Sequence, residues 1–216
     1  FALLPYEYQI WADLGVKACM VPFGRLYREG GPALHHFLAR GVLPGVGTDA
    51  PNSHPTTSLW DAMRLCLVGT ATRKQLEQLA GDPFDAAVTP TTETVLEMAT
   101  LGGARALFLD PRVDGLAVGR AADFILVDTD RPAFAPRFDD CRLVTMLLWC
   151  TEAALVDTVV VAGRVLVEGG RSTVWDEERV IAEAETAAQQ LFRAAGLDRT
   201  LPPRRPGQRY RSWTYL

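Results

Sequence analysis

The first fifty residues repeat one pattern twice: a short amphipathic helix, a Gly-Val pair and then an apolar strand. The first predicted helix covers Pro5–Leu14 and ends at Gly15, and the second covers Pro32–Arg40 and ends at Gly41. Proline suits the first turn of a helix, and glycine suits the position just after its last turn. An alternation of helix and strand is typical of parallel α/β folds, either a doubly wound sheet or a barrel.

Two more helices are predicted before the pattern changes. Apolar side chains recur at helical spacing over Ser58–Ala71 and again over Pro90–Leu107. The second of these helices contains Gly102 and Gly103 near its end. We expect this glycine pair to allow a close packing contact, because neither residue has a side chain to keep a neighbouring segment away.

From residue 110 on, short β-rich runs are separated by Gly, Pro and Asp. These runs are Leu116–Val118, Asp123–Val127, Leu143–Trp149 and Val156–Val167. The last run is expected to fold into a hairpin around Ala162-Gly163. A helix over Trp175–Ala195 and a tail rich in Pro and Arg complete the chain. The sequence therefore predicts a small β unit after the α/β part.

Charge and hydropathy exclude two classes of partner. Twenty-two basic residues against 26 acidic ones give a net charge of −4, whereas a nucleic-acid-binding domain normally carries a basic face. No apolar run approaches the 18 residues that a membrane-spanning helix needs, and no signal peptide is recognisable. We therefore expect a cytoplasmic protein that binds neither nucleic acid nor membranes.

The segment VGTDAPNSH, residues 46–54, combines an apolar strand with a polar loop. It places Asp49 at the C-terminal end of the strand, which is the edge where parallel α/β folds bind ligands. A carboxylate there can bind a metal, take a proton from metal-bound water, or do both. Taken alone, the pattern also fits an aspartate in a turn or a helix cap.

Other catalytic motifs are missing from the sequence. It contains no HxH, HExxH or CxxC pattern, no nucleophile elbow and no Walker loop. His35 and His36 are adjacent on a predicted helix, so their side chains should diverge by roughly 100° and should not close on one metal. We expect them to lie on the surface or to pack between helices.

Four blocks of the sequence occur in a familiar order. They read GVLPGVGTDAPNSHPTTSLWDAMRLCLVGTA, VLEMATLGGARALFL, VDGLAVGRAADFILVD and VDTVVVAGRVLVEGG. This series resembles the C-terminal half of amidohydrolase-superfamily enzymes, in the branch of cytosine deaminase, the adenosylhomocysteine-type deaminases and the triazine hydrolases. The GTD that ends a strand and the G-x-L-x-V-G-x-x-A-D block are the most specific parts of the resemblance.

The resemblance implies an α/β fold in three parts. Residues 1–109 would form the C-terminal part of a (β/α)8 TIM-type barrel, and residues 110–172 part of a small β-sandwich domain. Residues 173–216 would form a C-terminal helix and the Pro/Arg-rich tail. Asp123 would open a strand of the β-sandwich and act as a turn residue without a catalytic role.

The resemblance also implies one catalytic divalent metal, with zinc preferred over iron. Asp49 would bind this metal or lie against it, and would transfer the proton of the attacking water. Asn52 and His54 follow Asp49 at the mouth of the barrel, where we expect them to contact the substrate. A hydrogen bond to the loop backbone is the alternative role for His54.

The chain departs from the family in two ways. Where relatives carry an H-x-P-x-S-N-like motif, this chain reads MVPFGR, with Met20 in the place of the histidine and Arg25 in the place of the asparagine. We expect Arg25 either to bind an anionic or carbonyl-rich substrate or to form a salt bridge within a loop. The family's metal-binding histidines and its substrate-protonating acid would all precede Phe1. Because a catalytic metal needs about three protein ligands, residues absent from this chain would mainly hold it.

The resulting hypothesis is the C-terminal portion or subunit of a metal-dependent amidohydrolase. It would hydrolyse a C–N or C–X bond of a cyclic nitrogenous compound, and it would be active only with its N-terminal half. Its expected partners are that half, a small-molecule substrate and further copies of itself in a homo-oligomer. The alternatives are a non-catalytic half-barrel that acts as a structural or binding subunit, and an unrelated doubly wound binding domain.

Overall fold

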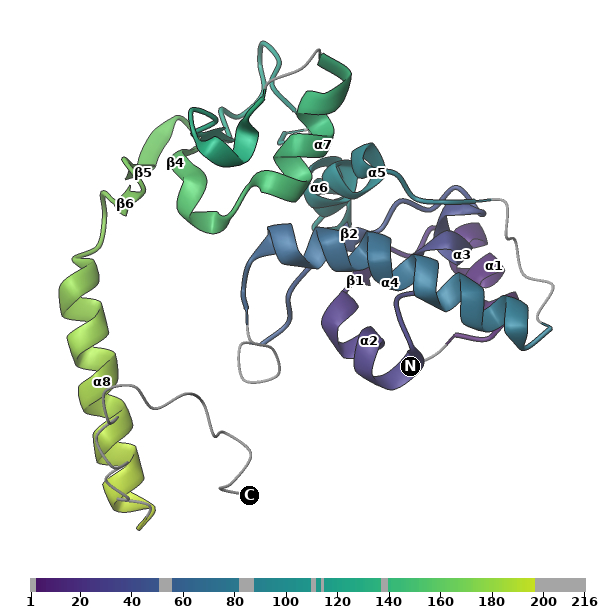
Figure 1. The fold of residues 1–216 in the computed structure, drawn as a ribbon, viewed down its shortest axis with the longest axis horizontal. Helices are drawn as coiled ribbons and strands as arrows, with labels where there is room; N and C mark the ends of the chain where they lie inside the picture. The colour runs from purple at the N-terminus through teal and green to yellow at the C-terminus, as the bar shows by residue number, and fades with distance from the viewer. Residues whose placement is uncertain are drawn as a thin grey trace. The chain divides into compact units, whose positions relative to one another are not determined.

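The computed structural model describes residues 3–50, 56–81, 88–109, 112–113, 115–136 and 140–196. Contacts divide the chain into two compact units, Phe1–Thr173 and Val174–Leu216. The first unit holds most of the elements drawn in Figure 1. Its α-helices are α1 (Pro5–Asp13), α2 (Pro22–Glu29), α3 (Leu34–Leu38), α4 (Leu59–Leu79), α5 (Thr92–Glu97), α6 (Gly103–Ala106) and α7 (Asp140–Cys150).

The predicted parallel pairing is confirmed. Strand β1 (Cys19–Met20) runs parallel to β2 (Gly45–Val46), with Cys19 opposite Gly45 and Met20 opposite Val46. The segments before both strands turn at glycines with left-handed backbones, Gly15 at φ 64° and Gly41 at φ 69°. Glycine adopts this conformation without steric cost, which explains why the chain turns there, one residue after the C-cap of α1 and two residues after the C-cap of α3.

The core lies between α4 and the elements on either side of it. Helix α4 packs against α2, α3, α5, α7 and β2. Fully buried side chains come from four of these segments and include Leu34, Cys66, Val95 and Leu148. Met98, in the one-turn π-helix Met98–Gly102 that joins α5 to α6, is also fully buried. The long helix α4 therefore organises the part of the unit that carries β1 and β2.

The close contact expected at the glycine pair is present at Gly102. A Cβ atom on Gly102 would lie 2.5 Å from the carbonyl oxygen of Pro44, a separation that real Cβ atoms do not show. Gly103 has more room, since its added Cβ would meet nothing closer than 3.7 Å. The π-helix thus lies directly against the segment that leads into β2.

Two segments differ from the sequence-based expectation. No helix was expected between residues 22 and 31, yet α2 occupies most of that stretch. It begins at Pro22 and ends at Glu29, and Gly30 caps it with a φ of 73°. The run over residues 143–149 was expected to be β-rich and is instead part of α7. A short, continuously apolar run fits a buried strand and a buried helix equally well.

Tertiary contacts settle the conformation of α7. Its Leu148 is fully buried, and Arg64 of α4 donates from Nε to the carbonyl oxygen of Leu148 at 2.9 Å. Arg64 also donates from Nη2 to the carbonyl of Thr151. The first bond satisfies a carbonyl in the last turn of α7 that the helix itself leaves without a partner, and the second satisfies the carbonyl of the residue that follows the helix.

A second, antiparallel sheet follows in the order β3-β4-β5-β6. Its strands are β3 (Phe124–Val127), β4 (Val156–Val161), β5 (Arg164–Glu168) and β6 (Arg171–Ser172). The predicted hairpin turn at Ala162-Gly163 is confirmed, with φ values of 50° and 75°. Asp123 accepts a hydrogen bond from the backbone N–H of Ala162, which is the turn role expected of it. Residues 116–118, also expected to be β-rich, form no strand.

The second unit contains α8 (Glu177–Ala194), which confirms the predicted C-terminal helix. Asp176 caps it by accepting a hydrogen bond from the backbone N–H of Arg179 at 3.0 Å. None of the residues of α8 is buried. Of the helices in the described ranges, α8 included, none combines the length and apolar character that crossing a membrane requires.

Candidate active site

A pocket of about 170 Å³ opens at the carboxyl edge of β1 and β2. The lining residues follow the two strands closely in the sequence. Helix α2 starts at Pro22, two residues after the end of β1, and Asp49 lies three residues after the end of β2. The carboxyl ends of two parallel strands lie at the same edge of their sheet. The lining residues are Val21, Gly24, Arg25, Arg28, Glu29 and Asp49.

Asp49 has a backbone conformation that is rare for residues other than glycine. Its φ is 62°, in the left-handed region, where aspartate occurs more often than most residues. The residue is exposed. Unusual backbone conformations of this kind cluster at functional sites, where the surrounding structure maintains them. The conformation therefore fits a residue placed for chemistry.

Arg25 and Arg28 face the same pocket from α2. Arg25 forms an ion pair with Glu29 one turn further along the helix, and the side chains of the pair are 33% and 15% exposed. Arg28 is exposed and forms no ion pair with any residue that the structure describes. The salt bridge expected as one role for Arg25 is thus formed, although on a helix and not within a loop.

The structure brings together two of the four residues predicted for the site. Asp49 and Arg25 line one pocket. The other two, Asn52 and His54, lie outside the described residues. Arg28 and Glu29 were not predicted. They share a helix with Arg25 at spacings of three and four residues, a signal that would have been visible had α2 been predicted.

Comparison with known proteins identifies the family. The sequence profile of the amidohydrolase family matches residues 6–166. The chain belongs to the amidohydrolase family. It is 35% identical over 188 residues to the 5-methylthioadenosine/S-adenosylhomocysteine deaminase of Desulforudis audaxviator. That alignment covers 86% of this chain and 40% of the relative. The family expected from the sequence blocks is confirmed.

Solved amidohydrolase structures share the fold. An adenosine deaminase from Xanthomonas campestris with bound zinc superposes with a TM-score of 0.75 at 23% identity, over 88% of this chain and 40% of that protein. An atrazine chlorohydrolase from Arthrobacter aurescens, complexed with zinc, superposes at 0.69 with 26% identity, over 86% and 38%. The mixed helix and strand fold is therefore that of amidohydrolase structures. The chain spans about 40% of the length of the proteins it matches.

Asp49 fits a zinc ion as one ligand, because it presents a carboxylate in an open pocket at a strand end. A catalytic zinc site has about three protein ligands. The other carboxylate in the pocket lining is that of Glu29, which pairs with Arg25. Among the described residues that line this pocket, Asp49 is thus the candidate zinc ligand whose carboxylate is not in the Arg25–Glu29 ion pair.

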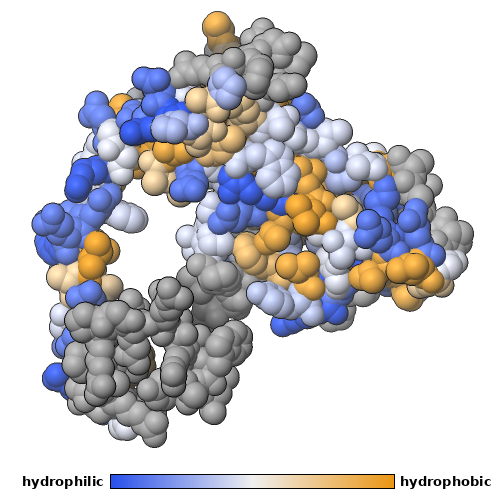
Figure 2. All heavy atoms as spheres, in the orientation of Figure 1, coloured by the Kyte–Doolittle hydropathy of each residue, from blue (hydrophilic) through white to orange (hydrophobic). Residues whose placement is uncertain are grey.

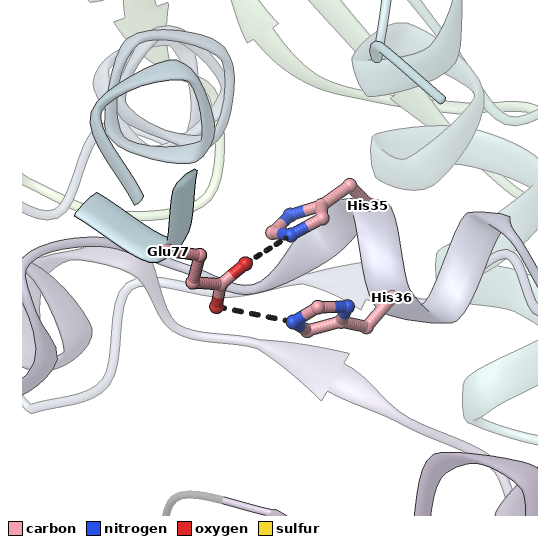
Figure 3. Close-up of side chains that lie close together, drawn as sticks. All are labelled: His35, His36 and Glu77. Carbon is pink, nitrogen blue, oxygen red and sulfur yellow. Dashed lines mark hydrogen bonds and ion pairs between the residues drawn. The ribbon is translucent and has the colours of Figure 1, made fainter. Parts of the chain in front are cut away.

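A second polar cluster of this amidohydrolase chain was not predicted. His35 and His36 of α3 both contact the carboxylate of Glu77 on α4, as Figure 3 shows. Nε2 of His35 lies 2.7 Å from Oε2, and Nε2 of His36 lies 3.1 Å from Oε1. The two imidazole rings are 3.9 Å apart between centroids. Arg73 donates from Nε to Oε1 at 2.6 Å.

The expectation that the two histidine side chains diverge is therefore wrong. Their Cβ atoms do leave the helix in different directions. The imidazoles nevertheless reach back to one carboxylate, whose two oxygen atoms accept from one ring each. Residues 35 and 36 lie more than 40 positions from Glu77, so no local sequence pattern marks the cluster.

Burial sets the charge state of this cluster. Burial lowers the pKa of His35, and it lowers the pKa of His36 to about 4. The negative charge of Glu77 acts in the opposite direction on both residues, but its effect is smaller than that of burial. Burial alone would raise the pKa of Glu77, but hydrogen bonds from Arg73 and His35 outweigh it and lower that pKa. Because all three pKa values are lowered, both imidazoles are neutral and the carboxylate of Glu77 is ionised near neutral pH. Each imidazole then donates its Nε2–H to the carboxylate.

The cluster has metal-ligand chemistry but is better described as a hydrogen-bond network. Its three candidate ligand atoms lie within 4.8 Å of one another. An imidazole that binds zinc normally donates its other ring N–H to a partner. Nδ1 of His35 is buried and has no hydrogen-bond partner among the described residues. Glu77 is also already engaged by Arg73.

Proposed function

We propose that this chain is the C-terminal portion or subunit of a metal-dependent amidohydrolase that deaminates a cyclic nitrogenous compound of the adenosine type. The observation that carries the proposal is the position of Asp49, exposed in a pocket at the carboxyl edge of β1 and β2. The named activity of the Desulforudis audaxviator relative, a deaminase, supports the choice of reaction.

The proposed chemistry assigns Asp49 two roles. A bound zinc ion supplies the Lewis acidity that makes water a nucleophile near neutral pH. Asp49 would contribute one carboxylate oxygen to the metal and accept a proton on its carboxylate, then return it to the departing amine nitrogen. Arg25, held by Glu29, would border the space in which the substrate ring lies.

We also propose that the remaining metal ligands come from outside this chain, either from another part of the same polypeptide or from a separate subunit. Strand β1 pairs with β2 and with no other described strand. Apolar side chains stay exposed on α1 and directly after it, among them Ile10 at 47% and Leu14, the residue that follows α1, at 74%. On the face drawn in Figure 2, hydrophobic patches lie among hydrophilic ones. Further barrel segments would cover surfaces of this kind.

Ammonia release tests the proposal directly. The protein that contains this chain, supplied with the N-terminal half that would carry the remaining metal ligands and loaded with zinc, would be incubated with 5-methylthioadenosine and with S-adenosylhomocysteine. We expect zinc-dependent release of one ammonia per turnover from at least one of the two compounds. Hydrolysis of a chlorinated triazine without any ammonia release from the nucleosides would overturn the proposed reaction. Complete inactivity of the zinc-loaded protein would favour a non-catalytic half-barrel.

A further inference from the structure

We propose that the pocket beside Asp49 accepts a substrate that carries an anionic substituent, a carboxylate or a phosphate, and that Arg28 binds this substituent. The inference deepens the proposed function and rests on it, because it assigns the substrate class of the same pocket. The sequence suggests Arg25 as a residue that could bind an anionic substrate. The inference adds Arg28, a second cationic side chain that was not predicted from the sequence.

The two arginines of the pocket differ in how their charges are balanced. Arg25 and Arg28 lie three residues apart, a spacing that makes their side chains neighbours on the surface of α2. Glu29 compensates the charge of Arg25 through the ion pair. Within the described ranges no acidic side chain pairs with Arg28, although it lines the same pocket. Its guanidinium therefore stays available to a ligand.

The remaining charge in the lining belongs to Asp49. If Asp49 directs its carboxylate toward the catalytic metal, Arg28 contributes a positive charge that no other side chain in the described lining of the pocket balances. A guanidinium presents its N–H groups as a fork that matches carboxylate and phosphate oxygens in paired hydrogen bonds. A neutral substrate would leave this group to water, whereas an anionic one would bind it.

Helix α2 is held in place by contacts outside the pocket. Arg73 of α4 donates from Nη1 to the carbonyl oxygen of Glu29, the last residue of α2, at 2.6 Å. The same guanidinium bonds to Glu77 through Nε, and Glu77 in turn accepts from His35. A recognition group on an anchored element loses less freedom on binding, which favours selectivity. The buried network thus positions the helix that carries Arg28.

The test compares three ligands that share the adenosine framework. S-Adenosylhomocysteine carries a carboxylate, adenosine 5'-monophosphate carries a phosphate, and 5-methylthioadenosine carries no charged substituent. Dissociation constants would be measured by titration calorimetry and KM by ammonia release, for the zinc-loaded protein and for Arg28→Gln. We expect the variant to weaken binding of at least one anionic ligand about ten- to hundredfold, as for loss of one charge-assisted contact. Binding of 5-methylthioadenosine should change less than about twofold.

Two further variants separate recognition from general effects of charge. Arg28→Lys keeps the charge without the fork and should fall between wild type and Arg28→Gln. Arg105→Gln is the control, because it also removes one exposed arginine, but from a different pocket. That pocket is lined by Val16 and Leu43, which precede β1 and β2, and the variant should bind all three ligands as wild type does. If Arg28→Gln loses affinity only for S-adenosylhomocysteine, the substituent that Arg28 binds is a carboxylate. If it loses affinity only for the monophosphate, the substituent is a phosphate.

The inference would be overturned if Arg28→Gln bound both anionic ligands as tightly as wild type does. It would also be overturned if the variant lost as much affinity for the neutral 5-methylthioadenosine as for the anionic ligands. Failure of the proposed function has a different signature. If no ammonia forms from any ligand, deamination is refuted, while the calorimetric comparison still decides whether Arg28 selects an anion.

Discussion

Met20 lies opposite Val46 in the parallel ladder between β1 and β2. This register determines which residues leave the two strands at the same edge, and it brings Arg25 and Asp49 to one pocket. Because side chains alternate between the faces of a strand, a shift of one residue would reverse the direction of every side chain on it. The candidate site thus depends on a two-residue pairing that the surrounding helices hold in register.

Substitution at Gly102 tests the contact that supports β2. Gly102→Ala would place a Cβ 2.5 Å from the carbonyl oxygen of Pro44, and neither backbone can yield without moving the π-helix or the segment before β2. We expect a loss of about 1–3 kcal/mol in the free energy of unfolding, the usual cost of overpacking. Urea denaturation of wild type and variant measures it.

Gly103 provides the matched control for this substitution. It is the next residue along, and an added Cβ would be no closer than 3.7 Å to its nearest neighbour. Because alanine favours helix over glycine by about 1 kcal/mol, Gly103→Ala should leave stability unchanged or raise it slightly. Similar losses for both substitutions would show that the Pro44 contact is not the cause.

Acidification should destabilise the chain through the buried histidines. Between the ordinary histidine pKa of 6.5 and the pKa of about 4 for His36, the unfolded chain binds a proton that the folded chain excludes. Stability is therefore fully present above pH 6.5 and is lost as the pH falls toward 4. Glu77, whose pKa is also lowered, loses its contribution in the same direction below its ordinary pKa of 4.5. We expect the histidine effect to be on the order of 2 kcal/mol.

Urea midpoints at several pH values across this window would measure the effect. His36→Gln keeps a side-chain donor for Glu77 but does not titrate, so its stability should depend less steeply on pH than that of wild type. Identical pH profiles for the two proteins would contradict the assignment of acid sensitivity to His36.

Much of the fold follows from local sequence signals. The Gly-Val pairs predict where α1 and α3 end and where an apolar run begins, and Ala162-Gly163 predicts the hairpin between β4 and β5. These signals work because glycine adopts left-handed conformations that other residues avoid. Asp49 could also be proposed from a local signal. It is a carboxylate that directly follows an apolar strand, and in parallel α/β folds this position lies at the edge where ligands bind.

The missed features depend on contacts between distant residues. Helix α7 requires Arg64, more than 80 positions earlier, to bond to its C-terminal carbonyls, so its apolar run alone could not be distinguished from a strand. The carboxylate shared by His35 and His36 belongs to a different helix. Arg28 was overlooked because α2 itself was not predicted.

The most direct test of the account is turnover by Asp49→Asn in the zinc-loaded protein, assembled with the proposed N-terminal half. Asparagine keeps the shape of the side chain but cannot hold the transferred proton. We expect kcat/KM for ammonia release to fall about 10²–10⁴-fold, the range that a positioned acid–base group contributes. Asp13→Asn on α1, which retains the oxygen that accepts from Gln9, should leave the rate unchanged. An Asp49→Asn protein that releases ammonia at the wild-type rate would contradict the catalytic role of Asp49 and the proposed function with it.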